Sequence, residues 1–143
     1  MTVAFRNVDA APSDPVATWP YEGLVAVIER GLLADWQPLV VEIRLRPWGA
    51  VARRVEAYLG YAELSSATRL LELLLERARI DAERGERAEV AARVREAIEA
   101  SGLTAAAFAA AIGTSPSRLS TYATGRVVPS ATLLVRMERV AGA

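Results

Sequence analysis

Residues 103–130 have the sequence LTAAAFAAAIGTSPSRLSTYATGRVVPS, and this stretch decides the fold that we expect for the C-terminal part of the chain. Thr104 and Ser115 each precede a short run of mostly helix-compatible residues, and hydroxyl side chains are favoured immediately before the first turn of a helix. Gly113 and Gly125 follow these runs, where glycine commonly closes a helix. The stretch therefore predicts two short helices separated by a break.

Apolar residues in and around this stretch recur at helical spacing. Phe108 and Ile112 stand four residues apart, and Leu119 and Tyr122 stand three apart, so each pair lies on one side of its helix. Further helices are expected on both sides, and their buried positions are Val94, Ile98, Leu134, Met137 and Ala141. From Val90 onward the sequence thus predicts four short helices around a shared apolar core.

The spacing of these signals resembles the Cro/CI (Xre) family of helix-turn-helix repressors over residues 88–141. The matching features, in ungapped register, are Leu103-Thr104, Phe108-Ala109, Ile112-Gly113, Ser115, Leu119-Ser120, Gly125-Arg126 and Pro129-Ser130. The resemblance implies that the helix at residues 115–124 lies in the major groove of DNA, which admits a helix and displays a distinct edge pattern for each base pair. We therefore expect this segment to bind operator DNA.

The resemblance also implies roles for individual side chains. Arg118 is placed to reach a base or a phosphate, and Arg126 and the backbone amides near Ala105 are expected to contact the DNA backbone. Thr114 and Ser115 are expected to add hydroxyl donors to phosphate. The residues expected to contact bases are Pro116, Ser117, Ser120 and Thr121.

Two departures from the family pattern lower the affinity that we expect from a single protomer. The outer positions of the helix that begins near Ala105 are alanines, where relatives usually carry polar or charged residues. The next helix lacks Gln, Asn or a second Arg for bidentate base pairs, each of which contributes about 1–3 kcal/mol of discrimination. A homodimer on an inverted-repeat operator would compensate by doubling the contacts. The alternative is a protein-interaction module that has lost DNA binding.

Charge and composition exclude several other classes. The 17 basic and 17 acidic residues cancel over the whole chain, which argues against nonspecific coating of nucleic acid. Residues 101–143 contain four basic residues and one acidic residue, Glu138. The basic residues are Arg118, Arg126, Arg136 and Arg139. Of these, Arg136 and Arg139 are expected to complement the dipole at the end of the last helix.

The chain contains no Cys and no His. It therefore has no disulfide, no thiolate metal site and no imidazole, which is the commonest metal ligand and general base. We expect no enzymatic activity, no catalytic residue, no metal and no cofactor. The sequence also shows neither a secretory signal nor a transmembrane stretch, so we expect a cytoplasmic protein.

The N-terminal half also has helical patterning, so the expected fold class is all-α. We expect a helical bundle at residues 1–85, with a role in dimerisation or partner binding, joined by a long helix to the DNA-binding domain at residues 86–143. Residues 1–19 resemble an extended lead-in to a helix that begins near Pro20. Arg77 to Glu89 alternates acidic residues with Arg, as in a solvated helical connector or hinge, and we place the domain boundary near Gly85.

Residues that commonly begin or end helices give more specific expectations for the bundle. Gly31 is expected to close the first helix in a left-handed conformation, and Asp35 to cap a second helix that Pro47 stops. A third helix is expected from about Trp48 to Leu59. Ser65 or Ser66 is expected to cap a long helix, in which the leucines Leu70, Leu71, Leu73, Leu74 and Leu75 predict burial on several sides.

Three functions remain open for the N-terminal half, namely dimerisation, binding of a partner protein and sensing of a ligand. Its aromatics, which include Trp19, Trp36 and Trp48, either form core and interface anchors, the favoured interpretation, or a stacking pocket for an effector. The segment FRNVDAAPSDPVATWPYEGL at residues 5–24, next to a Cro/CI-type domain, also resembles regulators of bacterial toxin–antitoxin operons. That resemblance implies an autoregulating antitoxin that binds a toxin through its N-terminal half. The alternative is a ligand-responsive Xre-type repressor without a toxin.

Overall fold

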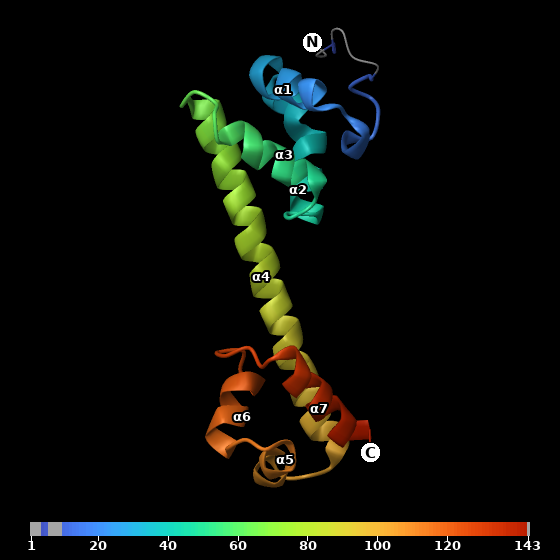
Figure 1. Cartoon of the computed structure of the whole chain (residues 1–143), viewed down its shortest axis with the longest axis vertical. Coiled ribbons are helices and arrows are strands. Elements are labelled where there is room, and N and C mark those ends of the chain that lie inside the picture. Colours follow the sequence, from blue (N-terminus) through green and yellow to red (C-terminus); the bar gives the residue numbers. More distant parts are fainter. Residues whose placement is uncertain (1–3, 6–9, 143) are drawn as a thin grey trace. The chain divides into compact units, whose positions relative to one another are not determined.

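A computed structural model describes residues 4–5 and 10–142, and within these residues every regular element is helical. The elements are the short 3-10 helices η1 (Val16–Thr18) and η2 (Leu33–Trp36) and the α-helices α1 (Tyr21–Arg30), α2 (Gln37–Leu45), α3 (Ala50–Leu59), α4 (Ser66–Ser101), α5 (Ala105–Ile112), α6 (Pro116–Ala123) and α7 (Ala131–Gly142). The chain divides into unit 1, residues 1–82, and unit 2, residues 83–143, and α4 contributes residues to both (Figure 1). The all-α prediction is confirmed.

Unit 1 is built around an apolar core to which all of its helices contribute. Two of the three tryptophans, Trp19 and Trp36, are buried in this core. Their indole N–H groups are satisfied there, because that of Trp19 donates to the carbonyl of Asp14 at 2.9 Å and that of Trp36 to the carbonyl of Val27 at 3.0 Å. The other buried side chains of the core are Val16, Leu24, Val27, Ile28, Leu39, Ile43, Val51, Ala52, Val55, Tyr58, Leu71, Leu75 and Ala78. Trp48, by contrast, is 44% exposed.

The structure corrects three local expectations in unit 1. The lead-in is not simply extended, because Val16 and Trp19 are buried from η1 and its C-terminal flank; residues 1–3 and 6–9 of that segment lie outside the described residues. Gly31 is extended (φ −75°, ψ 153°), and glycine suits it because a Cβ would collide with the carbonyl oxygen of Val27. Asp35 lies inside η2 and does not cap α2, because its carboxylate accepts from the N–H of Leu32 at 2.7 Å.

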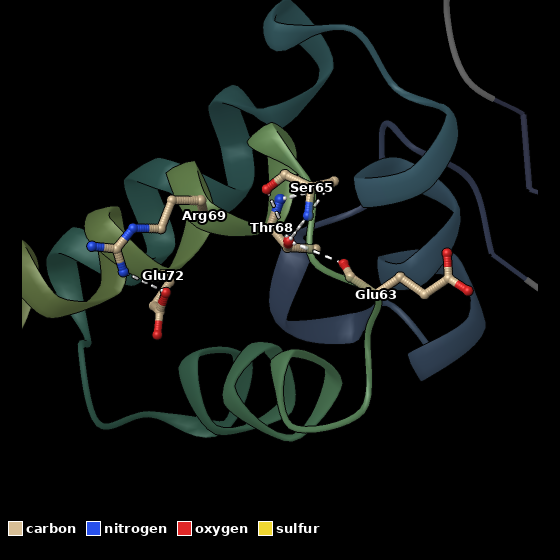
Figure 2. A network of polar contacts seen from close by, with 5 residues as sticks. All are labelled: Glu63, Ser65, Thr68, Arg69 and Glu72. Atoms are coloured by element: carbon tan, nitrogen blue, oxygen red, sulfur yellow. Dashed lines mark hydrogen bonds and ion pairs between the residues drawn. The ribbon is translucent and has the colours of Figure 1, made fainter.

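The leucine-rich start of α4 differs from its expected environment as well. Leu71 and Leu75 are buried, but Leu70 is 39% exposed and Leu73 is 43% exposed. Only one side of the helix is therefore covered, and the expectation of burial on several sides was wrong. The expected cap is correct at Ser65, whose Oγ accepts from the N–H of Thr68 at 3.1 Å (Figure 2).

Helix α4 also passes through the expected hinge without interruption. Gly85 lies within the helix, and a Cβ at this position would meet nothing within 4 Å. Packing therefore does not require glycine there. The first of the four short helices expected in the C-terminal domain is the C-terminal end of α4, which stops before Gly102.

Unit 2 has a separate core in which α5, α6 and α7 pack with the end of α4. Phe108, Ala109 and Met137 are fully buried at its centre. Its remaining buried members are Val94, Ala97, Ile112, Leu119, Tyr122 and Leu134. Among the described residues, no helix is both long enough and apolar enough to cross a membrane.

Candidate nucleic-acid interface

A three-residue turn, Gly113 to Ser115, separates α5 from α6. Gly113 has φ 79° and ψ 35°, a left-handed conformation that costs glycine little and other residues more. The N–H of Thr114 then donates to the carbonyl of Ala109 at 2.9 Å, which satisfies a backbone group at the end of α5. Gly113 thus sets the angle at which the chain leaves α5, as the sequence predicts.

Both helices that flank the turn begin with a side-chain cap. Thr104 Oγ1 accepts from the N–H of Ala107 at 3.1 Å, and Ser115 Oγ accepts from the N–H of Arg118 at 3.2 Å. Pro116 occupies the first turn of α6, where its missing N–H costs nothing. The N–H groups of Ala105 and Ala106, at the start of α5, have no partner within their own helix, so they remain suitable for a phosphate.

Helix α6 is fixed from its buried side and from its C-terminal end. Leu119 and Tyr122 pack into the core of unit 2. Arg95, on α4, donates from Nη1 to the carbonyl of Ala123 at 2.6 Å. Because that carbonyl belongs to the last turn of α6, the guanidinium both satisfies it and complements the negative end of the helix. The orientation of α6 is therefore set by contacts from two sides.

Two further arginines of unit 2 are committed to structural contacts. Arg136 donates from Nη1 to the carbonyl of Ile112 at 3.0 Å, so it caps α5 instead of complementing the end of its own helix. Arg93 donates from Nε to Glu138 at 2.8 Å and joins α4 to α7. The roles of Arg93 and Arg95 could not be predicted from the sequence, since their partners lie 45 and 28 residues away along the chain and leave no local signal.

The surface of α6 that faces away from the core carries the residues expected to contact bases. Pro116, Ser117, Arg118 and Ser120 are exposed, whereas Thr121 is half-buried. Thr121 Oγ1 donates to the carbonyl of Arg118 at 2.6 Å, which leaves its oxygen to accept and its methyl group for apolar contact. Ser117 Oγ lies 3.2 Å from that of Ser115, so these two hydroxyls are linked to each other.

Arg118, on α6, and Arg126, in the loop after it, place cations next to this surface. Both are exposed, and neither makes an ion pair or a side-chain hydrogen bond with another described residue. Residues 100–137 contain no Asp or Glu, so α5, α6 and the loop after α6 present no acidic side chain of their own. Val127 and Val128 are exposed and follow Arg126 directly, and the sequence predicts no role for either.

A family model described as a helix-turn-helix domain matches residues 89–143. The match covers the C-terminal end of α4 and all of α5, α6 and α7. No curated protein and no solved structure matches the chain. The prediction of a C-terminal helix-turn-helix domain is therefore confirmed, and it indicates a DNA-binding regulator.

Proposed function

We propose that this chain is a sequence-specific transcriptional repressor of the Cro/CI (Xre) type, with α6 as the helix that enters the major groove. The observation that supports this role most directly is the contrast between the paired arginines of unit 2 and the two on α6 and in the loop after it. Arg93, Arg95 and Arg136 are used to hold the helices together. Arg118 and Arg126 remain exposed beside a polar helix surface, as contacts with phosphates and base edges require.

In this proposal Arg118 and the hydroxyls of α6 discriminate bases, and Arg126 neutralises a phosphate. Ser and Thr hydroxyls pair with several bases, and the methyl group of Thr121 suits the methyl group of thymine. Such contacts give modest specificity for each protomer. The repressor therefore acts as a homodimer on an inverted repeat, whose half-sites lie about one helical turn apart.

We further propose that unit 1 supplies the protein contacts, as in an autoregulating antitoxin that binds its toxin through the N-terminal half, in the cytoplasm. Its support is the large number of apolar side chains that unit 1 exposes, because an exposed apolar surface marks protein interfaces. The most exposed of them are Leu32, Leu33, Leu45, Tyr61 and Leu64. No catalytic step is proposed for either unit.

Fluorescence anisotropy of the full chain on its own promoter fragment and on a scrambled fragment, over a salt series, tests the DNA-binding proposal. We expect a preference of about tenfold or more for the promoter. Arg118→Ala and Ser117→Ala should reduce this preference, whereas Arg126→Ala should weaken binding to both fragments and lower the salt slope by about 1.

Arg139→Ala provides a matched control, because Arg139 lies on α7, outside the turn and α6. It should leave the promoter preference unchanged. Equal binding of both fragments by the wild-type chain would contradict a repressor that recognises sequence through α6. Co-purification with the product of the neighbouring gene, weakened by Leu33→Glu but not by Arg118→Ala, is the result expected of an antitoxin.

A further inference from the structure

Unit 1 contains a cavity of about 450 Å³ where the loop after α3 leads into α4. This volume falls within the range of roughly 300–1,000 Å³ that is typical of small-molecule sites. Ile28 and Glu29 line it from α1, Tyr58 from α3, and Ala67 and Thr68 from α4, with residues 61–65 forming the rest of the lining. The cavity belongs to unit 1 alone and contains no residue of the helix-turn-helix domain.

The lining combines aromatic rings with carboxylates and contains no basic residue. It includes Tyr58, Tyr61, Glu29 and Glu63. The phenol of Tyr58 donates to Glu29 Oε1 at 3.0 Å. Burial of Tyr58 and this hydrogen bond raise the pKa of its phenol to about 12, so it remains a neutral donor at physiological pH. Glu29 makes no ion pair with a described residue, and its second carboxylate oxygen is available.

The aromatic wall is held in place although one of its rings faces solvent. Tyr61 is 66% exposed. Its hydroxyl is hydrogen-bonded with that of Tyr21, and its ring meets the ring of Tyr58 edge to face, with centroids 5.6 Å apart and planes at 80°. An exposed ring that contacts two neighbouring tyrosines loses little further freedom when a ligand packs on it.

The part of the lining formed by residues 63–65 is fixed as well. The N–H of Ser65 donates to Thr68 Oγ1 at 2.9 Å, the N–H of Thr68 donates back to Ser65 Oγ at 3.1 Å, and Thr68 Oγ1 donates to the carbonyl of Glu63 at 3.2 Å (Figure 2). Figure 2 also shows the ion pair of Arg69 with Glu72 on α4. Arg69 is thus paired along its own helix and is absent from the lining.

We propose that this cavity binds an organic cation, a protonated amine or guanidinium group, whose attached carbon skeleton packs against Tyr58 and Tyr61. The Glu29 carboxylate supplies the charge-assisted hydrogen bond. The exposed ring of Tyr61 attracts the cation, and no basic lining residue competes for Glu29. The same chemistry is offered by a free small amine and by an Arg or Lys side chain in a peptide. This site is independent of the DNA-binding function proposed for unit 2.

Isothermal titration calorimetry of the full chain with matched probes tests the proposal. Phenethylamine carries a cation and an aromatic ring, whereas 2-phenylethanol has the same skeleton without the charge. The peptide acetyl-Phe-Arg-Phe-amide offers a guanidinium in a polypeptide. We expect phenethylamine or the peptide to bind about tenfold or more tightly than 2-phenylethanol. Tighter binding by the amine would indicate a small-molecule ligand, and tighter binding by the peptide would indicate a protein ligand.

Two variants and one control place the binding at this cavity. Glu29→Gln retains an acceptor for the Tyr58 hydroxyl but removes the charge, and Tyr61→Leu removes an exposed ring; each should weaken binding of the cation about tenfold. Glu22→Gln changes an exposed glutamate on the same helix, outside the cavity, and should have no effect. Circular dichroism checks that each variant is folded.

The proposal is overturned if neither cationic probe binds at millimolar concentration, if 2-phenylethanol binds as tightly as phenethylamine, or if folded Glu29→Gln binds the cation like the wild-type chain. None of these results depends on DNA. Failure of the cation site and failure of the repressor proposal can therefore be distinguished.

Discussion

Unit 1 and unit 2 differ in what they leave on the surface. Among the described residues, the large apolar side chains exposed in unit 2 are confined to Leu103, Val127, Val128 and Val135. Unit 1 exposes many more, and these are Leu32, Leu33, Val41, Leu45, Trp48, Tyr61, Leu64, Leu70, Leu73 and Ile80. Unit 2 thus matches a domain whose ligand is polar, whereas unit 1 carries the surface expected of a domain with apolar partners.

The two units also differ in how their elements are fixed. In unit 2 the helix ends are capped locally, and guanidinium groups hold the last carbonyls of α5 and α6. In unit 1, guanidinium groups also hold carbonyls of other elements, as Arg54 does for Trp19 and Arg79 for Pro47, but aromatic side chains add further polar contacts, such as that of Tyr58 with Glu29. Because all tryptophans lie in unit 1, tryptophan fluorescence follows unit 1 alone, while circular dichroism follows both units.

Removal of the central side chain of unit 2 should produce the largest effect. Phe108 is fully buried, so Phe108→Ala is expected to cost about 3–5 kcal/mol of the stability of unit 2 and to abolish DNA binding. In thermal unfolding, the circular dichroism signal should decrease at a lower temperature, while the tryptophan fluorescence transition stays near its wild-type position.

The control for this variant is Val128→Ala, which shortens a side chain that is 42% exposed, and it should leave both transitions unchanged. If Phe108→Ala shifts tryptophan fluorescence and circular dichroism together, the two units unfold as one. In that case, the two separate cores would not correspond to two independently unfolding parts of the chain.

Two glycines provide a sharper test of the second unit. Gly113 has φ 79°, so Gly113→Ala forces a left-handed alanine and should destabilise unit 2 by about 1–2 kcal/mol. Gly85 lies in α4 with open space around it, so Gly85→Ala should stabilise the chain by about 0.5–1 kcal/mol. Urea unfolding followed by circular dichroism measures both changes. Destabilisation by Gly85→Ala would indicate that α4 must bend there.

Local signals explain why unit 2 was predicted in detail. Thr104, Gly113 and Ser115 each act on atoms within about one helical turn, so their effect can be predicted from adjacent residues. The positions of the side chains expected to contact DNA follow from the same register. The contacts of Arg95 and Arg136 could not be predicted, because they depend on how α4 and α7 pack against the other helices.

Tertiary packing explains the errors in unit 1. Helix propensity does not reveal which side of a leucine-rich helix its neighbours will cover, so the exposure of Leu70 and Leu73 had no sequence signal. Gly31 was expected to be left-handed, but its backbone is extended. Glycine suits this position because a Cβ would collide with the carbonyl oxygen of Val27. The cavity at Tyr58 and Glu29 joins residues 29 positions apart, and sequence alone suggested only that an aromatic pocket was one alternative.

Each unit contains a helix that is capped by a serine hydroxyl, so the two units can be compared by removing one oxygen atom from each. Ser65→Ala and Ser115→Ala each remove a hydroxyl that caps a helix, and each should cost about 1 kcal/mol. Tryptophan fluorescence should detect the loss at Ser65 but not at Ser115. Circular dichroism and anisotropy on promoter DNA should detect the loss at Ser115. Weaker DNA binding by Ser65→Ala would mean that unit 1 contributes to the DNA complex.

The smallest expected effect concerns the ion pair between Glu56 on α3 and Arg79 on α4, whose closest atoms are 2.8 Å apart. Hydrogen bonding to the Arg79 guanidinium lowers the pKa of Glu56. A carboxyl with a lowered pKa in the folded state stabilises the fold above its unfolded pKa and loses this contribution as the pH falls through its folded pKa. Because the Glu56 side chain is largely exposed, Glu56→Gln should cost less than about 1 kcal/mol at neutral pH.

The pH dependence distinguishes this electrostatic contribution from packing. Wild type and Glu56→Gln should differ in tryptophan-monitored urea unfolding at neutral pH, and the difference should disappear as the pH falls below the lowered folded-state pKa of Glu56, where its carboxyl is protonated in both the folded and the unfolded chain. Arg79 also donates from Nε to the carbonyl of Pro47 at 2.9 Å, and this contact remains in the variant. A difference that persists at low pH would therefore mean that the Glu56 side chain stabilises unit 1 by its contacts and not by its charge.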